Sequence, residues 1–467
     1  AAALEAPWET WAVFLHPAQR EFVERDFAGP ARVIGSAGTG KTVVALHRAA
    51  RLVKEDPDAR VLLTTFNARL AEGLAQKAAI LRPDPKARAR LTVTDLGTLA
   101  RGLYAAAFAP EEEATQADVG AALARAAEEA GESADPAFLQ DEWRLIVDAW
   151  AVPDRDTYRD LPRLGRKVRM AASKREALWE VFAAARADLA AQGKRTRAQM
   201  LHRLAEHYRA GAAAPFTHAV VDEAQDIAVP ELVFLAAVAG ERPNGLFFAG
   251  DIGQRIFRAP FPWKAAGVDI QGRSRSLKVC YRTSQQIRSV SDLLLPPSLV
   301  ESDGSEDRRT GVVSLFEGPP PELRKFADTG EEARAAGAWL AERVSEGVRA
   351  EEIAVLVRSD AELGRAEEAA AQAGLAVSRI GTDKAATARI GTMHEAKGGE
   401  FRVVAVLACE QDVIPSADRL LEARDESMID EIMATERHLL YVAATRARER
   451  LWVSGAGTVS EFLEDLL

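Results

Sequence analysis

The chain has 467 residues, of which 48% are hydrophobic and 28% are charged, and its formal net charge is −10. This length allows two or three domains with substantial cores, and the composition is that of an ordinary globular protein. No apolar run approaches the ~20 residues that a membrane helix needs, so we expect no membrane contact. The first residues show neither a starting Met nor a signal-peptide pattern, which predicts a cytosolic protein and a piece of a longer chain.

Cysteine usage and local charge limit the possible classes further. Cys280 and Cys409 are the two cysteines, and two isolated cysteines predict neither a zinc site nor a disulfide framework. The negative net charge argues mildly against nucleic acid as a partner, but nucleic acid responds to local patches. Basic side chains gather in residues 159–175 and 273–288. Each run is either a solvated surface or part of a nucleic-acid site.

Short β-rich apolar runs alternate with longer helical stretches along the chain. Continuous apolar runs of this length are typical of parallel strands that helices cover on both faces. We therefore predict α/β architecture with two parallel sheets. The predicted strands are residues 31–34, 61–65, 218–221, 246–249, 312–316, 353–357, 403–407 and 451–453.

A long segment without a convincing strand, residues 104–209, interrupts the first group of strands. It is rich in Ala, Glu and Arg and is predicted to be a helical insertion. Residues 295–311 include Pro296, Pro297 and several acidic residues, a composition typical of a linker between domains. The predicted division gives residues 1–103 and 210–295 to the first α/β domain, 104–209 to the insertion and 296–467 to the second α/β domain.

A glycine-rich loop joins the first predicted strand to a helical pattern. Backbone N–H groups of such a G-x-x-x-x-G-K-T loop surround phosphate oxygens, aided by the N-terminus of the helix. Lys41 is expected to reach the β- and γ-phosphates, and the Thr42 hydroxyl to coordinate Mg²⁺. A turn without a ligand would not explain the strand–loop–helix context. The loop consists of Gly35, Ser36, Ala37, Gly38, Thr39, Gly40, Lys41 and Thr42.

Two acidic residues, Asp222 and Glu223, directly follow the predicted strand at residues 218–221. A P-loop needs an acidic partner on a neighbouring strand: Asp222 is expected to hold Mg²⁺, and Glu223 to orient the attacking water. A helix cap would account for one carboxylate but not for two behind an apolar strand. Together the two motifs predict a nucleoside triphosphatase (NTPase) that uses ATP and Mg²⁺, without indicating what the energy drives.

Further motifs follow in a fixed order and resemble those of the UvrD/Rep/PcrA helicases of superfamily 1. The resemblance implies two RecA-like domains and an ATPase that moves 3′ to 5′ on single-stranded DNA as a helicase, with single-strand/duplex junctions as partners. The segments that carry it are residues 15–19 (Q motif), 64–67 (motif Ia), 222–226 (motif II), 250–257 (motif III), 281–284 (motif IV), 391–401 (motif V) and 441–447 (motif VI).

The resemblance also implies roles for residues around the nucleotide. Gln19 would read the adenine edge, Tyr281 would stack on the adenine, and Glu400 would bond the ribose. Gln254 would sense the γ-phosphate. Arg282 and Arg446 are the candidate arginine fingers, a contribution worth ~10³–10⁵ in rate. Because Arg446 belongs to the second sheet, hydrolysis would require the two sheets to close on ATP.

On the DNA side, the resemblance implies aromatic faces on which bases stack, each worth ~1–3 kcal/mol. Phe66 and Phe257 occupy such positions, and Asn67 lies in the motif Ia turn. Trp263 is either a further DNA contact or a core residue. His394 either links the DNA track to the ATP site or has a structural role.

The sequence also departs from the family pattern. Residues 93–97 lack the usual His of motif Ib, Val43 replaces a common Arg, and Ala259 replaces a common aromatic. Residues 380–389 form a short link where UvrD-like enzymes carry a second accessory (2B) domain. The resemblance therefore implies a short form, in which unwinding is an open question. The alternatives are a DNA-stimulated ATPase switch or recruitment module that does not unwind, and an RNA-directed motor.

Overall fold

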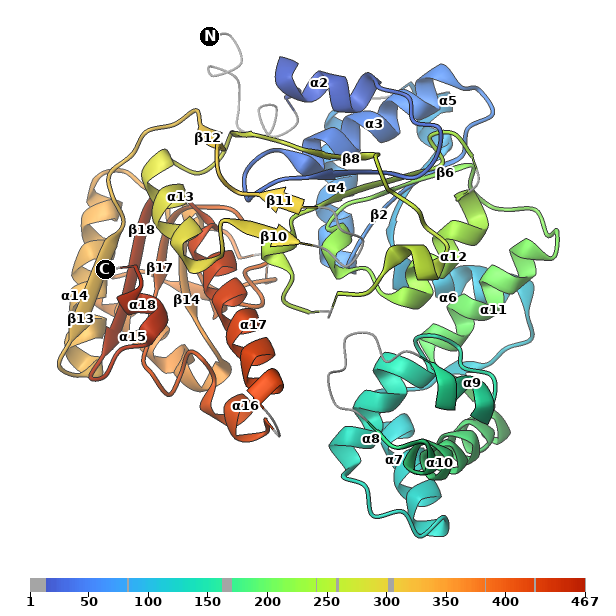
Figure 1. Cartoon of the computed structure of the whole chain (residues 1–467). Helices are drawn as coiled ribbons and strands as arrows, with labels where there is room; N and C mark the ends of the chain where they lie inside the picture. The colour runs from blue at the N-terminus through green and yellow to red at the C-terminus, as the bar shows by residue number, and fades with distance from the viewer. Residues whose placement is uncertain are drawn as a thin grey trace.

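The computed structural model describes residues 14–81, 84–161, 170–240, 242–257, 260–300, 306–382, 384–423 and 426–466. Two six-stranded sheets lie side by side, and a lobe of helices hangs from the first (Figure 1). Every neighbouring pair of strands within these two sheets is parallel. The predicted α/β architecture is confirmed. Among the described residues, no helix combines the length and apolarity needed to cross a membrane.

The first sheet has the strand order β3-β2-β6-β7-β1-β8 and is apolar on both faces. Alternate residues of β6 belong to different cores: Val220 packs with Phe247 on one face, whereas Val221 packs with Phe248 on the other. Burial on both faces explains why these strands read as continuous apolar runs. The strands are β1 (Ala31–Ile34), β2 (Val61–Thr65), β3 (Leu91–Asp95), β6 (His218–Val221), β7 (Leu246–Gly250) and β8 (Ser274–Ser276).

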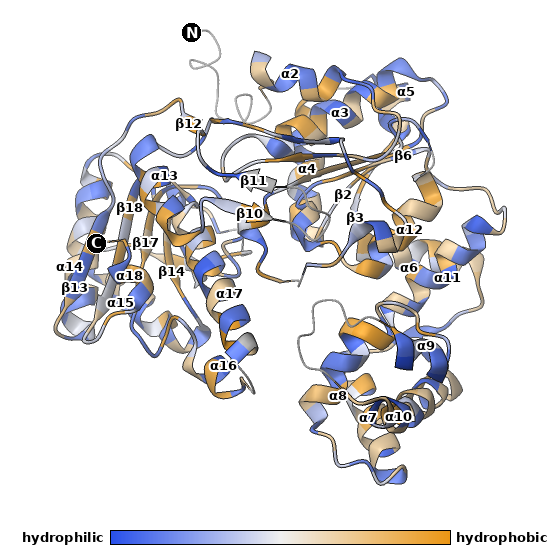
Figure 2. Cartoon of the chain, in the orientation of Figure 1, coloured by the Kyte–Doolittle hydropathy of each residue, from blue (hydrophilic) through white to orange (hydrophobic). Residues whose placement is uncertain are grey.

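The second sheet has the strand order β13-β18-β17-β14-β16-β15. Its two faces likewise belong to separate cores, with Leu356 and Val404 on one and Val355 and Val403 on the other. Figure 2 shows the hydrophobic strands of this sheet enclosed by helices of mixed character. The strands are β13 (Glu322–Phe326), β14 (Ile353–Val357), β15 (Val377–Arg379), β16 (Ala388–Thr392), β17 (Phe401–Val406) and β18 (Ala447–Ala456).

Helices cover both sheets, and each sheet buries the apolar side chains of the helices packed on it. The helices of the first unit are α2 (Pro17–Glu24), α3 (Lys41–Glu55), α4 (Ala68–Ile80), α5 (Pro85–Ala89), α6 (Leu96–Ala107) and α12 (Val229–Ala239). Those of the second unit are α14 (Thr329–Ser345), α15 (Leu363–Gln372), α16 (Ala417–Leu421), α17 (Glu426–Ala444) and α18 (Glu461–Glu464).

The predicted helical insertion forms the lobe, with a core of its own that includes Trp143, Tyr158 and Phe182. One detail of the prediction is wrong, because a short parallel pair of strands, β4 (Glu112–Glu113) and β5 (Lys194–Arg195), closes the lobe near the first sheet. The helices of the lobe are α7 (Gln116–Glu129), α8 (Pro136–Glu142), the π-helix η1 (Trp143–Val147), α9 (Arg155–Asp160) and α10 (Ala172–Ala191), whereas α11 (Arg197–Arg209) packs in the core of the first unit.

The chain crosses between the two units through short strands and one helix. The predicted strand at 312–316 is not part of the second large sheet: β12 (Val313–Ser314) pairs instead with β9 (Val279–Cys280). Helix α13 (Gln285–Ser291) starts beside the second sheet, where Ser284 N–H donates to Arg448 O. An antiparallel pair, β10 (Ser298–Val300) and β11 (Glu306–Arg308), follows. The predicted domain limits stay predictions.

Trp263 lies in the core of the first unit rather than on its surface. Its side chain belongs to η4 (Trp263–Ala266) and is 4% exposed. Its ring meets Phe248 edge-on at 4.7 Å between centroids, and the Arg32 guanidinium lies 5.0 Å from its centroid. The expectation that Trp263 contacts DNA is therefore corrected, since the packed ring presents no face to a base.

We expect Trp263→Ala to lower the free energy of unfolding by ~3–5 kcal/mol, because it leaves a large cavity in a packed core. Urea denaturation followed by circular dichroism measures the change. Leu421→Ala is the control, because Leu421 is 84% exposed and should alter stability by at most ~0.5 kcal/mol. A Trp263→Ala variant as stable as the parent chain would contradict the core assignment.

Candidate active site

The glycine-rich loop lies between β1 and α3, as predicted. Gly38 and Gly40 have φ values of 77° and 79°, in the left-handed region that favours glycine. A β-carbon at Gly40 would collide with the Gln19 amide, and one at Gly38 would lie 2.8 Å from Cys280 Sγ. The N-cap residue of α3 is Gly40, which has no side chain to cap the first turn. The N–H groups of that turn are therefore available to an anion.

Lys41 is held close to the loop by backbone carbonyls. Its ammonium donates to Gly35 O at 2.8 Å and to Ser36 O at 2.9 Å, and it lies 3.7 Å from Asp251 Oδ2. The side chain is almost fully buried at the mouth of the loop. A positive charge fixed in this way faces the same space as the free N–H groups of α3, which suits the binding of phosphate.

The two predicted acids stand at the end of β6, opposite the loop. Thr42 Oγ1 donates to Asp222 Oδ2 at 2.7 Å, so the two expected magnesium ligands are adjacent. Burial, followed by the charge of Glu223, raises the pKa of Asp222 to about 6. Glu223 has a φ of 55°, which is uncommon for a residue other than glycine and is often found at functional sites. Gln225 Nε2 donates to its carboxylate.

Gln19 and Tyr281, the two residues expected around the adenine, both contact His16. Tyr281 OH lies 2.8 Å from His16 Nδ1, and the two rings are 4.9 Å apart. Gln19 is 2% exposed, and both ends of its amide are engaged: it donates to Thr39 O at 3.0 Å and accepts from His16 N–H at 3.0 Å. Gln19 thus holds the loop in this structure, and reading an adenine edge would require it to exchange one of these bonds.

The second unit closes the site from the other side. Arg446 is 2% exposed and donates through Nη2 to Gln254 Oε1 at 2.8 Å and through Nε to Val442 O at 2.9 Å. Burial, followed by the charge of Arg282, lowers the pKa of Arg446 to about 10. A cavity of about 290 Å³ is lined by Lys41, Thr42, Asp222, Glu223, Gln254, Tyr281, Arg282, Glu400 and Arg446, among others.

Glu400 and Arg282 form an ion pair at the edge of this cavity. Burial opposes ionisation of the Glu400 carboxyl, but the charge of Arg282 and other cations outweighs it and lowers its pKa. Glu400 was expected to bond a ribose and Arg282 to reach a phosphate. In this structure the charges of Glu400 and Arg282 are paired with each other instead.

Sequence reasoning missed three contacts that join the units here. Lys397, of motif V, forms a buried ion pair with Asp226 and donates to Gln254 O at 2.6 Å. Tyr441 OH accepts from Ala37 N–H at 3.2 Å. All of these residues lie inside the quoted motifs, but nothing in the sequence indicates which partner each one meets.

The expected DNA-contacting residues lie next to the nucleotide cavity. Phe66 and Phe257 stack with ring centroids 4.9 Å apart and an interplanar angle of 13°. His394 lies 6.1 Å from the Phe257 ring, and the Lys397 ammonium lies 5.2 Å from it. Asn67 caps α4 by accepting from Leu70 N–H at 2.9 Å, a structural role that the sequence analysis did not assign. Phe257 is 36% exposed.

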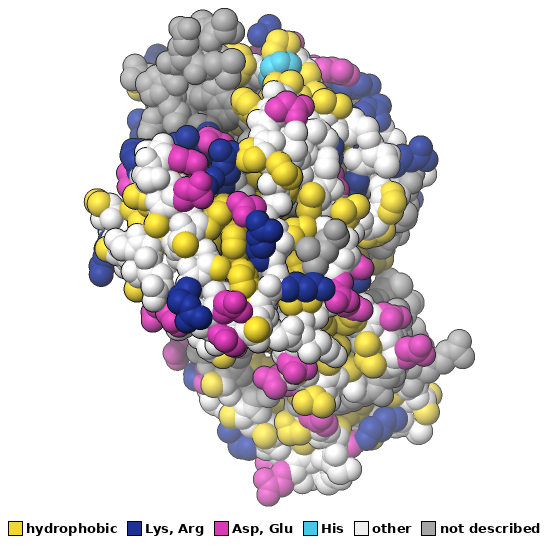
Figure 3. All heavy atoms as spheres, turned by 90° about the vertical axis from the view of Figure 1, so that its left-hand side faces the viewer, with side chains coloured by type: hydrophobic (Ala, Val, Ile, Leu, Met, Phe, Trp, Pro, Cys, Tyr) yellow, Lys and Arg dark blue, Asp and Glu magenta, His cyan; other side chains and the backbone are white. Residues whose placement is uncertain are grey.

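Some basic side chains of the two runs bond to other groups of the protein. In the run 273–288, Arg273 donates to Pro30 O at 2.8 Å, and Arg288 pairs with Asp292. The run 159–175 includes residues 162–169, which lie outside the described residues, as do Ala259 and residues 1–13. The face in Figure 3 mixes acidic, basic and hydrophobic side chains.

Comparisons with known proteins agree with this arrangement. A family model described as an AAA domain matches residues 19–260, more than half of the chain, and one described as the UvrD-like helicase C-terminal domain matches residues 371–458. The chain is 29% identical over 162 residues to the ATP-dependent DNA helicase UvrD2 of Mycobacterium tuberculosis, covering 34% of this chain and 23% of that protein. It is 39% identical over 67 residues to the ATP-dependent DNA helicase PcrA of Staphylococcus epidermidis, covering 14% and 8%.

The matches thus span less than a quarter of these relatives' length. A solved C-terminal domain of a possible DNA helicase from Lactobacillus plantarum WCFS1 has a TM-score of 0.29 at 21% identity, over 40% of this chain and 94% of that one. This likeness is too low to support a statement about the fold. The AAA match contains five strands of the first sheet, and the UvrD-like match contains four strands of the second. The chain belongs to the UvrD/PcrA-like superfamily 1 helicases.

Proposed function

We propose that this chain is an ATP-dependent DNA helicase and translocase that moves 3′ to 5′ along single-stranded DNA and hydrolyses ATP between its two sheets. One observation carries the proposal: Lys41 of the first unit and Arg446 of the second line the same cavity. A phosphoryl group bound there would meet positive charge from both sides, and hydrolysis would then depend on how the units are placed.

The first unit would bind the phosphates and orient the nucleophile. The N–H groups of α3 and the Lys41 ammonium would hold the phosphate oxygens. Thr42 Oγ1 and Asp222 Oδ2 are hard oxygen donors and fit Mg²⁺, which would neutralise charge on the phosphates when bound. Glu223, next in the chain, would accept a hydrogen bond from the attacking water and aim it at the γ-phosphate.

The second unit would complete the site. Arg446 bonds to Gln254 here, and its guanidinium could exchange this partner for a γ-phosphate oxygen with a small movement of the units. Positive charge placed where negative charge develops is worth ~10³–10⁵ in rate. Arg282 would be a second source of such charge if it left Glu400.

Movement on DNA would follow from contacts shared by the two sites. Lys397 bonds to Gln254 O and to Asp226, and its ammonium also faces the ring of Phe257. A change at the γ-phosphate that moves Gln254 would therefore reach the stacked pair of Phe66 and Phe257. Aromatic stacking of bases is tolerant of sequence, which suits a motor that steps along any single strand.

A second candidate function is a DNA-stimulated ATPase switch or recruitment module that does not unwind duplexes. It is favoured by the short link between β15 and β16, residues 380–387, where a UvrD-like enzyme would carry its 2B domain. A strand-displacement assay on tailed duplexes of both polarities separates the two. Displacement from a 3′ tail supports the helicase, whereas DNA-stimulated ATPase without displacement supports the switch.

Lys41→Ala is expected to abolish ATP hydrolysis, because it removes the charge that faces the phosphate-binding loop. Phosphate release in the presence of single-stranded DNA measures this. Lys54→Ala, an exposed change on the same helix, is the matched control and should hydrolyse ATP at the parent rate. Normal turnover by the Lys41→Ala variant would exclude the proposed site.

Arg446→Ala is expected to bind ATP and to hydrolyse it at least ~10³-fold more slowly, as loss of an arginine finger would require. Binding of a fluorescent ATP analogue, measured beside single-turnover hydrolysis, separates the two steps. Arg437→Ala, which removes an arginine of α17 paired with Asp465 near the surface, should leave both unchanged. A defect confined to nucleotide binding would refute the role of Arg446 in hydrolysis.

Phe257→Ala is expected to weaken binding of a single-stranded oligonucleotide by ~1–3 kcal/mol, the range found for one lost stacking contact. Fluorescence anisotropy measures the affinity, and hydrolysis without DNA should stay at the parent rate. Phe257→Tyr keeps the ring and should restore the affinity. If the alanine variant bound DNA as tightly as the parent, Phe257 would serve only to pack against Phe66.

A further inference from the structure

A second cavity, larger than the nucleotide cavity, lies between the helical lobe and the first unit. Its volume is about 810 Å³, within the ~300–1,000 Å³ usual for ligand sites. The lobe supplies walls from α7, α8 and η1, the first unit supplies α11, the segment 227–231 and Phe261, and the second unit adds Glu422. We call it the lobe pocket. None of the residues assigned above to ATP or DNA lines it.

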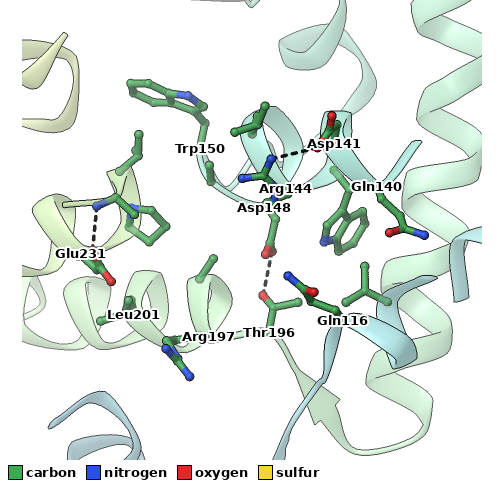
Figure 4. A pocket seen from close by; sticks show the side chains of 18 of the residues that line it. Gln116, Gln140, Asp141, Arg144, Asp148, Trp150, Thr196, Arg197, Leu201 and Glu231 are labelled. Atoms are coloured by element: carbon green, nitrogen blue, oxygen red, sulfur yellow. Dashed lines mark hydrogen bonds and ion pairs between the residues drawn. The ribbon is translucent and has the colours of Figure 1, made fainter. Parts of the chain in front are cut away.

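A π-helix shapes one wall of the lobe pocket. In η1 the Asp148 N–H donates to Trp143 O, five residues earlier, at 2.8 Å. Such helices are rare and are often found at functional sites. Ala151, just beyond, has a φ of 48°. This irregular turn brings Asp148 and Trp150 together on the wall of the same hollow (Figure 4).

Asp148 is the buried polar group of this wall. Its side chain is almost fully buried, and its carboxylate accepts from Thr196 Oγ1 at 2.9 Å (Figure 4). A carboxylate has about four acceptor positions, so capacity remains for a donor in the cavity. Burial raises the pKa of Asp148 to about 6 despite this bond and the charge of Arg186. Thr196, Arg186 and Gln199 thus offset only part of the cost of burying the charged carboxylate, and a cationic ligand would offset more of it.

The charge of the lobe pocket disfavours phosphate. Its two arginines are already paired, Arg144 with Asp141 at 2.9 Å and Arg197 with Glu113 at 2.7 Å. Three further acids remain on the wall, and they are Asp148, Glu231 and Glu422. A nucleic-acid backbone would meet excess negative charge there, whereas a cation would be attracted.

Aromatic rings also line the lobe pocket. Trp150 and Phe261 are half-buried and meet edge to face, with centroids 6.3 Å apart at 88°. The face of a tryptophan ring attracts a planar guanidinium, and a carboxylate beside it can accept two of the guanidinium N–H groups. Trp150 and Asp148 offer both kinds of contact within one cavity.

We propose that the lobe pocket binds an arginine side chain of a partner protein, with the guanidinium stacked on Trp150 and hydrogen-bonded to Asp148. Arginine is a preferred anchor at protein interfaces for this reason. The occupied pocket would border the segment 227–231, which directly follows Asp222, Glu223 and Asp226 in the chain. A partner docked there would touch the nucleotide-binding unit without covering the proposed DNA contacts.

The test titrates the full chain with N-acetyl-arginine methylamide and follows the Trp150 indole N–H signal by NMR. Loss of that signal in Trp150→Phe assigns it. We expect a saturable shift with a Kd on the order of 1–10 mM, typical of a single small group. Asp148→Asn should raise this Kd at least ~10-fold, a loss of about 1.4 kcal/mol. Glu128→Gln, an exposed acid on α7 outside the pocket, should leave it unchanged.

The neutral analogue N-acetyl-citrulline methylamide is the decisive comparison, because it uses the unaltered chain and needs no variant to fold. An equal response to both compounds, or no shift with arginine up to about 50 mM, would overturn the proposal. A shift with dAMP but not with the arginine compound would make this a nucleobase pocket instead. These readouts need neither ATP nor DNA, so their failure would leave the proposed motor function intact.

Discussion

A small set of polar contacts that meet at Gln254 and Asp226 joins the two sheets across their seam. Arg446 reaches from the second unit and donates to Gln254 of the first, while Lys397 donates to the backbone of the same Gln254 and pairs with Asp226. Buried charges are costly unless they are paired, so these groups hold the seam together only while their partners stay in place. The seam also buries apolar side chains, since Ala37 and Ile256 of the first unit belong to the same core cluster as Leu439 and Tyr441 of the second.

The same contacts relate the two proposed activities to each other. Gln225 donates to Glu223 and accepts from the Asp251 N–H at 2.9 Å, and so ties the acids at the end of β6 to the strand end of β7. Phe257 follows Gln254 by three residues and stacks on Phe66. Groups that would sense the γ-phosphate and groups that would stack on bases are thus parts of one connected set. We infer that occupancy of either site would bias the other.

Much of the fold could be predicted because buried parallel strands are apolar throughout. Strands β1, β2, β6 and β14 have the predicted bounds. Edge strands could not be found in this way: β8 (Ser274–Ser276) and β13 (Glu322–Phe326) are polar and only partly buried, so no apolar run marks them. The segment 312–316 resembles a strand of the large sheet in sequence, but only Val313 and Ser314 form a strand, and it belongs to a small sheet. Val313 and Leu315 are exposed.

The candidate site, like the fold, could be predicted from the sequence only in part. Lys41, Thr42 and Asp222 follow from local motifs, since backbone geometry fixes where each must lie. The pairing of Glu400 with Arg282, the burial of Trp263 and the lobe pocket depend on segments far apart in the chain.

A structure with Mg²⁺ and a non-hydrolysable ATP analogue tests the central claim most directly. The account predicts the γ-phosphate within hydrogen-bonding distance of both Lys41 Nζ and the Arg446 guanidinium. A γ-phosphate that contacts Lys41 while Arg446 points out of the cavity would contradict it.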